Sequence, residues 1–397
     1  MSRERQTAES VARYWRTVRH LRVAQLGHRI RLAVRRGVWG RRARRIDASY
    51  RQRAGGQRVD WARRGLAAFA GGRADRREVS GSLVIADAAL KGCFGFLGET
   101  KDLGVPVAWD RPDLMGTLLW KTHLHEFPYA VDLALAHRET GEARHRDGFL
   151  ALARSWSESQ PIGKPGFHRV AWNERVVATR LMHWAAAGAL LGLRDGDPDA
   201  DWLGREIVRH ALFLRDNLAL DLQANHLFRD CVALAFAHEL SGCAPDGLAL
   251  LEREVREQIL PDGAHYEGSA MYHAVCLADL IDLRLLLGDG APAWLTDAVR
   301  RAGGFLASVL LGDGDIPLLG DAWRGEVAPG VLLEQARAAA GPLVPPREPE
   351  RWSGLVRLER GPVRVVMRAG PHGPDHQLGH APADLLSFDL SHGARRL

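Results

Sequence analysis

Residues 118–340 carry a helical pattern of apolar side chains that covers more than half of the chain. The apolar residues recur at intervals of three and four, and Gly, Pro and Asp interrupt the pattern between segments. The pattern predicts helices at 118–139, 143–158, 172–192, 201–219, 226–241, 247–260, 271–287 and 293–311. Antiparallel helices joined by short loops indicate stacked hairpins in a toroid or a bundle. No repeat of fixed period is visible, which disfavours a standard solenoid.

The composition changes at residues 341–352, where GPLVPPREPERW combines four prolines with charged residues. This segment predicts an extended linker between domains. Three segments beyond it alternate apolar and polar residues over the length of a strand, GLVRLERG, VRVVMRAG and LLSFDLSHG. Residues 353–397 therefore predict the beginning of a β domain. So few strands bury little apolar surface, and we expect them to be completed by a longer chain, the helical domain or a partner.

The charge is concentrated at the N-terminus. The net charge is +6, but residues 1–64 hold nineteen arginines against four acidic residues. We predict a basic helical arm at 1–90 that precedes the toroid domain at 91–340. Near-helical spacing favours a solvated helix with apolar residues packed beneath it, namely Trp15, Leu21, Leu26, Ile30 and Val34. The alternative is an arm that contacts anionic lipid, nucleic acid or acidic polysaccharide; nucleic acid is not favoured, because aromatic residues do not interleave the basic run.

Several classes of protein are disfavoured by composition. No stretch approaches the roughly 18 apolar residues that a membrane span needs. The four cysteines form no C-x-x-C pair and no compact cluster with histidine, which argues against a zinc finger or a disulfide scaffold. The N-terminus lacks the apolar core and cleavage site of a secretory signal, so a cytoplasmic location is the default prediction.

Three polar clusters lie at element boundaries, where loops can aim side chains into a cleft: Asn225–His226, 262–273 and 375–388. Asn225 also suits a helix N-cap, and Tyr272 in a first helical turn also suits a core position. His273, which is next to Tyr272 in the sequence, is interpreted as a surface residue. The third cluster holds His376, His380 and Asp384, whose spacing matches no strong metal-ligand signature. A further segment, 312–323, is interpreted as a turn that brings Asp321 and Trp323 to the rim of a cleft.

In this order the segments resemble the heparinase II/III family of polysaccharide lyases. The resemblance covers the chain from Lys91 onward. It rests on FLG (96–98), LLWKTHLHEFPY (118–129), WNE (172–174) with Arg180, NHL (225–227), QILPDGAHYEGSAMYH (258–273), PLLGD (317–321) and GHAPADLLSF (379–388). The segment YWRTVRHLR is similar to members associated with bacterial exopolysaccharide production. The resemblance implies an incomplete (α/α) toroid followed by an antiparallel β-sandwich, with the active site between them. It also allows a periplasmic location.

The chemistry that the resemblance implies is β-elimination on an acidic polysaccharide. A base removes the C5 proton of a uronic acid while the C4 oxygen leaves, and the site must neutralise the neighbouring carboxylate. Tyr272 matches the family's catalytic tyrosine, Asn225 its carboxylate-binding asparagine with His226 assisting, and His380 the histidine from the β domain. A phenol suits the acid role because its usual pKa is about 10. His380 or Tyr272 takes the C5 proton according to the configuration of the uronate.

Two departures from the family pattern affect metal binding and the completeness of the site. Pro382 occupies the position where many members have a second histidine that binds a structural metal. The sequence also ends before the downstream aspartate and histidine that complete the site. We therefore predict no zinc and no other cofactor.

Candidate sugar-binding residues come from side chains that suit acidic glycans. Trp faces stack on pyranose rings, and the Arg guanidinium suits carboxylate or sulfate. The candidates are Trp120, Trp172, Trp323, Arg180 and Arg229, and a structural role suits each of them equally well.

Two other functions compete with the lyase. One is an (α/α)-toroid glycoside hydrolase that uses carboxylates such as Asp262 and Glu267. The other is a non-catalytic protein that binds acidic polysaccharide or assembles exopolysaccharide. An uncovered edge on the last strand, within LLSFDLSHG, also predicts self-association and low activity of this chain.

Overall fold

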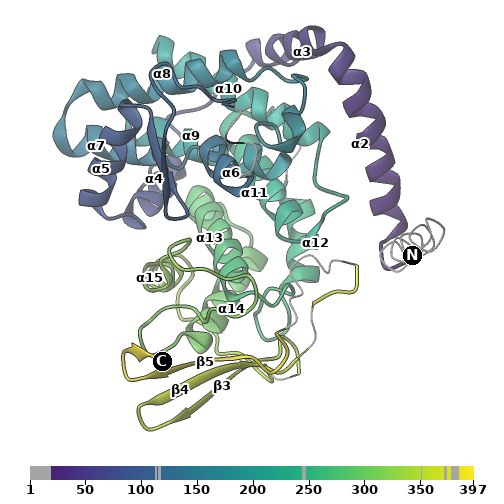
Figure 1. Ribbon diagram of the computed structural model, residues 1–397, viewed down its shortest axis with the longest axis vertical. Coiled ribbons are helices and arrows are strands. Elements are labelled where there is room, and N and C mark those ends of the chain that lie inside the picture. Colours follow the sequence, from purple (N-terminus) through teal and green to yellow (C-terminus); the bar gives the residue numbers. More distant parts are fainter. Residues whose placement is uncertain are drawn as a thin grey trace, which may run out of the picture.

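The computed structural model describes residues 19–111, 114, 118–243, 247–349, 351–370, 373–376 and 384–397. Within these residues, fourteen α-helices build the body of the molecule and a small antiparallel sheet lies at one end (Figure 1). The helices are α2 (Val23–Arg41), α3 (Ala43–Gly55), α4 (Arg64–Asp75), α5 (Val79–Leu90), α6 (Leu118–Glu126), α7 (Tyr129–Thr140), α8 (Ala143–Ser159), α9 (Glu174–Leu190), α10 (Pro198–Asp216), α11 (Ala224–Ser241), α12 (Leu248–Gln258), α13 (Ala270–Leu287), α14 (Ala293–Val309) and α15 (Pro329–Ala340). The strands are β1 (Cys93–Phe96), β2 (Glu99–Asp102), β3 (Leu355–Arg360), β4 (Val363–Arg368), β5 (Phe388–His392) and β6 (Arg395–Arg396). The predicted fold class is confirmed, since helical hairpins come first and an antiparallel sheet follows.

One predicted helix, 118–139, is two helices in the structure. α6 and α7 are separated by Phe127, whose backbone is left-handed with φ 58°, and by Pro128. Proline lacks the N–H that a continuous helix would need at this point. The break places the Phe127 ring in the core, edge-on against Trp156 and Trp184.

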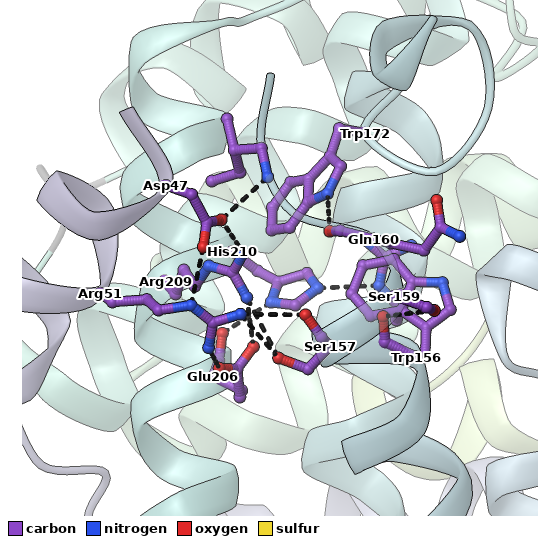
Figure 2. Close-up of polar contacts among 12 residues, drawn as sticks. Asp47, Arg51, Trp156, Ser157, Ser159, Gln160, Trp172, Glu206, Arg209 and His210 are labelled. Atoms are coloured by element: carbon purple, nitrogen blue, oxygen red, sulfur yellow. Dashed lines mark hydrogen bonds and ion pairs between the residues drawn. The ribbon is translucent and has the colours of Figure 1, made fainter. Parts of the chain in front are cut away.

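A buried network of charged side chains holds α3 against α8 and α10 (Figure 2). Asp47 accepts a hydrogen bond from Nε of Arg51 at 2.8 Å and pairs with Arg209. Glu206 accepts from Nη1 of Arg51 at 3.0 Å and from Nη1 of Arg209 at 2.9 Å. The Oγ of Ser157 lies 3.2 Å from Nη1 of Arg209 and 3.3 Å from Nη2 of Arg51. A helix of the predicted arm is thus fastened to the helices of the predicted toroid, and the domain division at residue 90 stays a prediction.

Replacing Ser157 with Ala should lower the free energy of unfolding by about 1–3 kcal/mol, because it removes an acceptor that the buried Arg209 and the partly exposed Arg51 share. Ser159→Ala is the matched control, since the Ser159 hydroxyl bonds only the carbonyl of Trp156 in its own helix. Urea unfolding of the two variants measures the difference. Equal decreases in the free energy of unfolding for the two variants would show that the network does not stabilise the packing of α3.

α2 packs differently from the prediction. Leu21 and Leu26 are half-buried, but Ile30 and Val34 are exposed, which contradicts the expectation that they pack beneath the basic surface. Trp15 lies outside the described residues. The side chains that α2 buries are Gln25, His28, Leu32 and Trp39.

The C-terminal sheet has the strand order β3-β4-β5-β6, with every pair antiparallel. It packs on α14 through a small apolar core, Ala264, Phe305, Val309, Leu311, Leu319, Leu355 and Val366. We expected no strand beyond β5, and this is wrong: β6 pairs with it, Ser391 opposite Arg396 and His392 opposite Arg395. Self-association through a sheet edge stays a prediction.

The structure bears on two expectations from the composition, which concern membrane-spanning helices and the cysteines. Across the described ranges, no helix combines the length and the apolar character needed to cross a membrane. All four cysteines are free thiols. Cys231 and Cys276 are buried, and Cys93 and Cys243 are half-buried.

Candidate active site

A buried pair, Asn225 and Glu267, joins the start of α11 to the loop before α13. Gln223 and Ala224 have left-handed backbones, with φ 61° and 51°, and this sharp entry turns the Asn225 side chain away from its own helix terminus. The Asn225 Nδ2 lies 3.0 Å and 2.8 Å from the two carboxylate oxygens of Glu267. The alternative interpretation of Asn225 as an N-cap is therefore wrong, because Gln223 occupies the cap position.

Glu267 sets the orientation of the Asn225 amide. An amide nitrogen carries two N–H donors and no acceptor, so the carboxylate fixes which end of the amide faces it. The backbone N–H of Asn225 also points to this carboxylate, 3.4 Å away. The sequence indicated Glu267 only as a candidate hydrolase carboxylate. No local signal links it to Asn225, which lies 42 residues earlier in the chain.

Tyr272 lies in the first turn of α13. Ser269 caps this helix by accepting a hydrogen bond from the Tyr272 N–H at 3.5 Å. The Tyr272 ring is largely buried, and the Arg175 guanidinium lies 6.0 Å from its centroid. Burial raises the pKa of Tyr272 to about 12, while the charge of Arg175 and its hydrogen bond oppose that rise. The phenol is therefore protonated at neutral pH, in the form that can donate a proton.

Arg175 is a site residue that sequence reasoning missed. It follows directly after the WNE motif, so the motif extended by one position would have included it. It lies in the first turn of α9, from which its side chain reaches the Tyr272 hydroxyl on α13. A cation in this place stabilises negative charge that develops on the phenol oxygen.

His226 and His273, which neighbour the two principal residues, differ in their surroundings. His226 follows Asn225 on α11 and is half-buried. His273 is buried, which contradicts its interpretation as a surface residue. Its Nδ1 accepts the backbone N–H of His265 at 3.1 Å, so its Nε2 donates to the Ala302 carbonyl at 2.9 Å. His273 thus ties the 262–269 loop to α14.

The β sheet contributes Arg368, a second residue that the sequence did not indicate. Its Nη1 donates to the Gly268 carbonyl at 3.1 Å, and its Nε lies 3.3 Å from Oδ1 of Asp384. Gly268 has φ 70°, and a Cβ there would lie 2.8 Å from Nη2 of Arg368, so only glycine fits. Arg368 therefore attaches the sheet to the loop between Glu267 and Tyr272.

His380 and Pro382 lie outside the described residues, and their predicted roles stay predictions. Nearby, His376 lies 3.9 Å from the Glu257 carboxylate, and Asp384 pairs with Arg368. In the part of the chain that the structure describes, no group of three His, Cys, Asp or Glu side chains could hold a metal ion. These donors do not fit the structural metal of the family, and no step proposed below depends on a metal.

A cavity of about 760 Å³ lies next to α13, but Tyr272, Arg175 and Asn225 are not among the residues of its wall. Its wall comes from α4, α6, α9, α11 and α13 and from the loop 323–328, and it includes Val275, about one turn beyond Tyr272 on α13. Trp323 lines the cavity, as the prediction of a cleft rim expects. Asp321 in the same turn is half-buried and raises the pKa of Tyr272 through its charge.

Arg229 also lines this cavity, but its guanidinium is already engaged. Its Nε and Nη2 donate to the two oxygens of Asp279 at 2.9 Å and 3.1 Å, and its Nη1 donates to Oγ1 of Thr179 at 3.1 Å. This carboxylate raises the pKa of Arg229, against the effect of burial. A ligand anion would have to compete with Asp279 for the same donors.

Three of the predicted sugar-binding residues lie in the core instead of a cleft. The Trp120 indole donates to the Glu99 carbonyl at 3.0 Å, and the Trp172 indole donates to the Gln160 carbonyl at 2.8 Å (Figure 2). Arg180 is fully buried. Its three nitrogens donate to His210, to the His125 carbonyl and to the Ala171 carbonyl, at 2.8, 2.7 and 2.9 Å. A structural role explains all three, because none presents a face or a free donor to a ligand.

Glu174, the residue before Arg175, is a buried carboxyl at the start of α9. Burial raises its pKa to about 7, and the charge of Asp221 contributes to the increase, while a backbone hydrogen bond opposes it. Burial and the charge of Glu174 also raise the pKa of Asp230. Both carboxyls therefore favour the protonated form in the folded protein.

The free energy of unfolding should fall as pH rises from about 4.5 to about 7, because the native state holds a proton on Glu174 that the unfolded state releases. Glu174→Gln should remove the part of this dependence that Glu174 contributes, leaving that of Asp230, and raise stability at pH 8 by about 3 kcal/mol. Urea unfolding at pH 5 and pH 8 measures the effect, with the exposed Glu158→Gln as control. An unchanged pH slope in Glu174→Gln would contradict the assignment.

Comparison with known proteins identifies the family. The heparinase II/III N-terminus family model matches residues 24–340, and the heparinase II/III-like C-terminal model matches residues 346–397. Both models belong to the heparinase II/III family of polysaccharide lyases, and they match this chain on both sides of the predicted linker. The chain belongs to the heparinase II/III family.

Individual relatives are distant. A heparin-sulfate lyase of Bacteroides thetaiotaomicron is 24% identical over 235 residues, which are 51% of this chain and 32% of that protein. The crystal structure of heparinase III has a TM-score of 0.65 at 19% identity, covering 81% of this chain and 57% of that one. A mutant of the heparan sulfate lyase HepC from Pedobacter heparinus has a TM-score of 0.56 at 18% identity, covering 93% and 62%. The chain spans about a third of the curated relative and less than two thirds of these structures.

Proposed function

We propose that this protein is a polysaccharide lyase that cleaves an acidic, uronate-containing polysaccharide by β-elimination. The observation that carries the proposal is the protonated Tyr272 phenol beside Arg175, with a buried, pre-oriented Asn225 nearby on α11. Membership of the heparinase II/III family supplies the reaction class.

In the proposed reaction, Asn225 hydrogen bonds to the uronate carboxylate, with His226 assisting. This contact lowers the cost of the negative charge that develops when C5 loses its proton. Glu267 holds the amide in place, and the uronate carboxylate has to share the Nδ2 donors that the two Glu267 oxygens accept. Asn225 therefore acts on the substrate carboxylate, and Glu267 is a positioning residue.

The bond changes follow from this arrangement. A base takes the C5 proton, the C5–H electron pair forms the C4–C5 double bond, and the C4–O bond breaks. Tyr272 gives its proton to the departing oxygen, and Arg175 stabilises the phenolate that is left. His380 is the proposed base for one C5 configuration; for the other, Tyr272 would have to lose its own proton before it takes that of C5, and its raised pKa opposes this step.

The hydrolase alternative is less well supported by the geometry. The Asp262 carboxylate accepts the backbone N–H groups of Ala264 and Ser353, at 3.0 Å and 3.1 Å. Glu267 accepts from Asn225. Both carboxylates thus have structural partners, which disfavours a role as the free acid and base of a hydrolase.

The test is a screen of the purified protein against heparan-type, alginate-type and other uronate polymers. The proposal predicts growth of the ultraviolet absorbance of an unsaturated uronide with at least one of them. New reducing ends without this absorbance would indicate hydrolysis. Binding to the polymers without any cleavage would select the non-catalytic alternative and overturn the proposal.

A further inference from the structure

The outward face of α2 is apolar. Val23, Ile30, Val34 and Val38 are 85%, 67%, 63% and 46% exposed, and we call these four residues the apolar stripe. At about 100° per residue they fall within roughly a quarter of the helix circumference. The opposite face packs on the protein through Gln25, His28, Leu32 and Trp39. A surface helix normally has the reverse arrangement, with polar side chains toward solvent.

Polar contacts fix α2 in this orientation. Nε2 of Gln25 donates to the Asp221 carbonyl at 3.2 Å, and Nε2 of His28 lies 3.0 Å from the Leu218 carbonyl. Arg35 donates to the Asp216 carbonyl, and its guanidinium lies 4.6 Å from the centre of the Trp39 ring. α2 forms an outer edge of the molecule in Figure 1. The stripe therefore faces away from the toroid.

Arginines lie on one flank of the stripe and past its C-terminal end. Residues 19–59 contain thirteen arginines and one acidic residue, Asp47, which is buried in the α3 network. Helical geometry places Arg31 on one flank of the stripe and Arg41 in line with it at its C-terminal end, whereas Arg29 and Arg36 lie beside the packed face. Exposed arginines continue past the C-terminal end of the stripe at positions 41, 42, 44 and 45. The surface thus combines an aliphatic centre with a cationic border.

We infer that α2 lies in the headgroup region of an anionic lipid membrane, with the apolar stripe toward the acyl chains. Helices with one apolar face and basic flanking residues bind in the headgroup region and lie parallel to the membrane plane. Arginine stems can follow the apolar surface while the guanidinium groups reach lipid phosphates. The five arginines within α2 favour a helix that lies on the membrane.

The apolar stripe favours a lipid membrane over the other partners that could bind the positive charge. A hydrated polyanion such as a polysaccharide or a nucleic acid would use the arginines, but aliphatic side chains gain little against it. A second copy of this chain would cover the stripe, but it would bring two arginine borders together, and like charges disfavour that contact.

The test is sedimentation of the full chain with vesicles, either phosphatidylcholine alone or phosphatidylcholine mixed with phosphatidylglycerol. We expect binding to the anionic vesicles only, weakening as salt is raised. Ile30→Ser/Val34→Ser keeps the charge and should reduce partitioning at least about tenfold. Arg31→Gln/Arg42→Gln should reduce it about fivefold for each charge removed. Val84→Ser/Ile85→Ser on α5 is the matched control, because those side chains are 70% and 46% exposed, and it should bind like the parent.

Three results would overturn the inference. The first is no binding to anionic vesicles. The second is a stripe variant that binds as well as the parent, which would indicate attraction of a polyanion by charge alone. The third is a parental dimer in solution that the stripe variant converts to a monomer. Thermal melting checks that each variant folds, and Val23→Ser/Val38→Ser repeats the test if the first stripe variant does not.

Discussion

Tyr272→Phe should reduce β-elimination by about 10²- to 10⁴-fold, because it removes only the hydroxyl that donates the proton to the departing C4 oxygen. The fold should be preserved, since the ring keeps its packing at the start of α13. The measurement is kcat/KM from the absorbance of the unsaturated uronide, together with the affinity for the polymer, which should change little.

Tyr50→Phe is the matched control for Tyr272→Phe. Its hydroxyl, on α3, donates to Asp216 at 2.9 Å and has no part in the proposed reaction, so its loss should affect stability and not elimination. Turnover of Tyr272→Phe at the parental rate would remove Tyr272 from the proposed reaction.

Asn225→Ala should reduce elimination by about 10²- to 10³-fold, the usual cost of removing one donor that stabilises developing charge. It also leaves the buried Glu267 carboxylate without the amide donor, which should lower the melting temperature. The two effects are separated by measuring kcat on protein shown to be folded.

Asn217→Ala provides the comparison for stability alone. The Asn217 Nδ2 donates to the Phe213 carbonyl at 2.7 Å, so this variant also loses a buried hydrogen bond, but Asn217 has no part in the proposed reaction. If Asn225→Ala behaved like Asn217→Ala, with a lower melting temperature and an unchanged kcat, Asn225 would be a structural residue only.

The sequence predicted the order of elements well, because apolar spacing determines which segments can bury a helical face. The helix 118–139 was placed as one element although it contains Pro128, and the break there follows from the missing N–H. Three C-terminal strands were placed by alternation and glycine, while β6, two residues long, the hairpin of β1 and β2, and the helix α15 were missed.

Helical spacing alone does not show which face of a helix meets a cavity. Trp172 and Arg180 lie in recognisable motifs, yet their partners, Gln160 and His210, come from other elements. α2 shows the same limit: periodicity indicated a two-sided helix, but the protein buries the face with Gln25 and His28.

The orientation of Asn225 depends on two left-handed backbones, at Gln223 and Ala224. Non-glycine residues rarely adopt this conformation, so no local rule predicts it. Its partner Glu267 is likewise set by the tertiary fold, and Arg368 reaches the same loop from the C-terminal sheet. The residue types of the site could be read from the sequence, but their mutual geometry required the packed helices.

The proposed elimination is tested most directly by degrading the polysaccharide in water enriched with ¹⁸O and weighing the products. Elimination breaks the C4–O bond without adding water, so the account predicts products with an unsaturated uronide end and no ¹⁸O beyond the slow exchange at the reducing end, which a control oligosaccharide without the protein measures, and their near absence with Tyr272→Phe. Saturated products that carry ¹⁸O would show that the protein adds water across the bond, and would contradict the account.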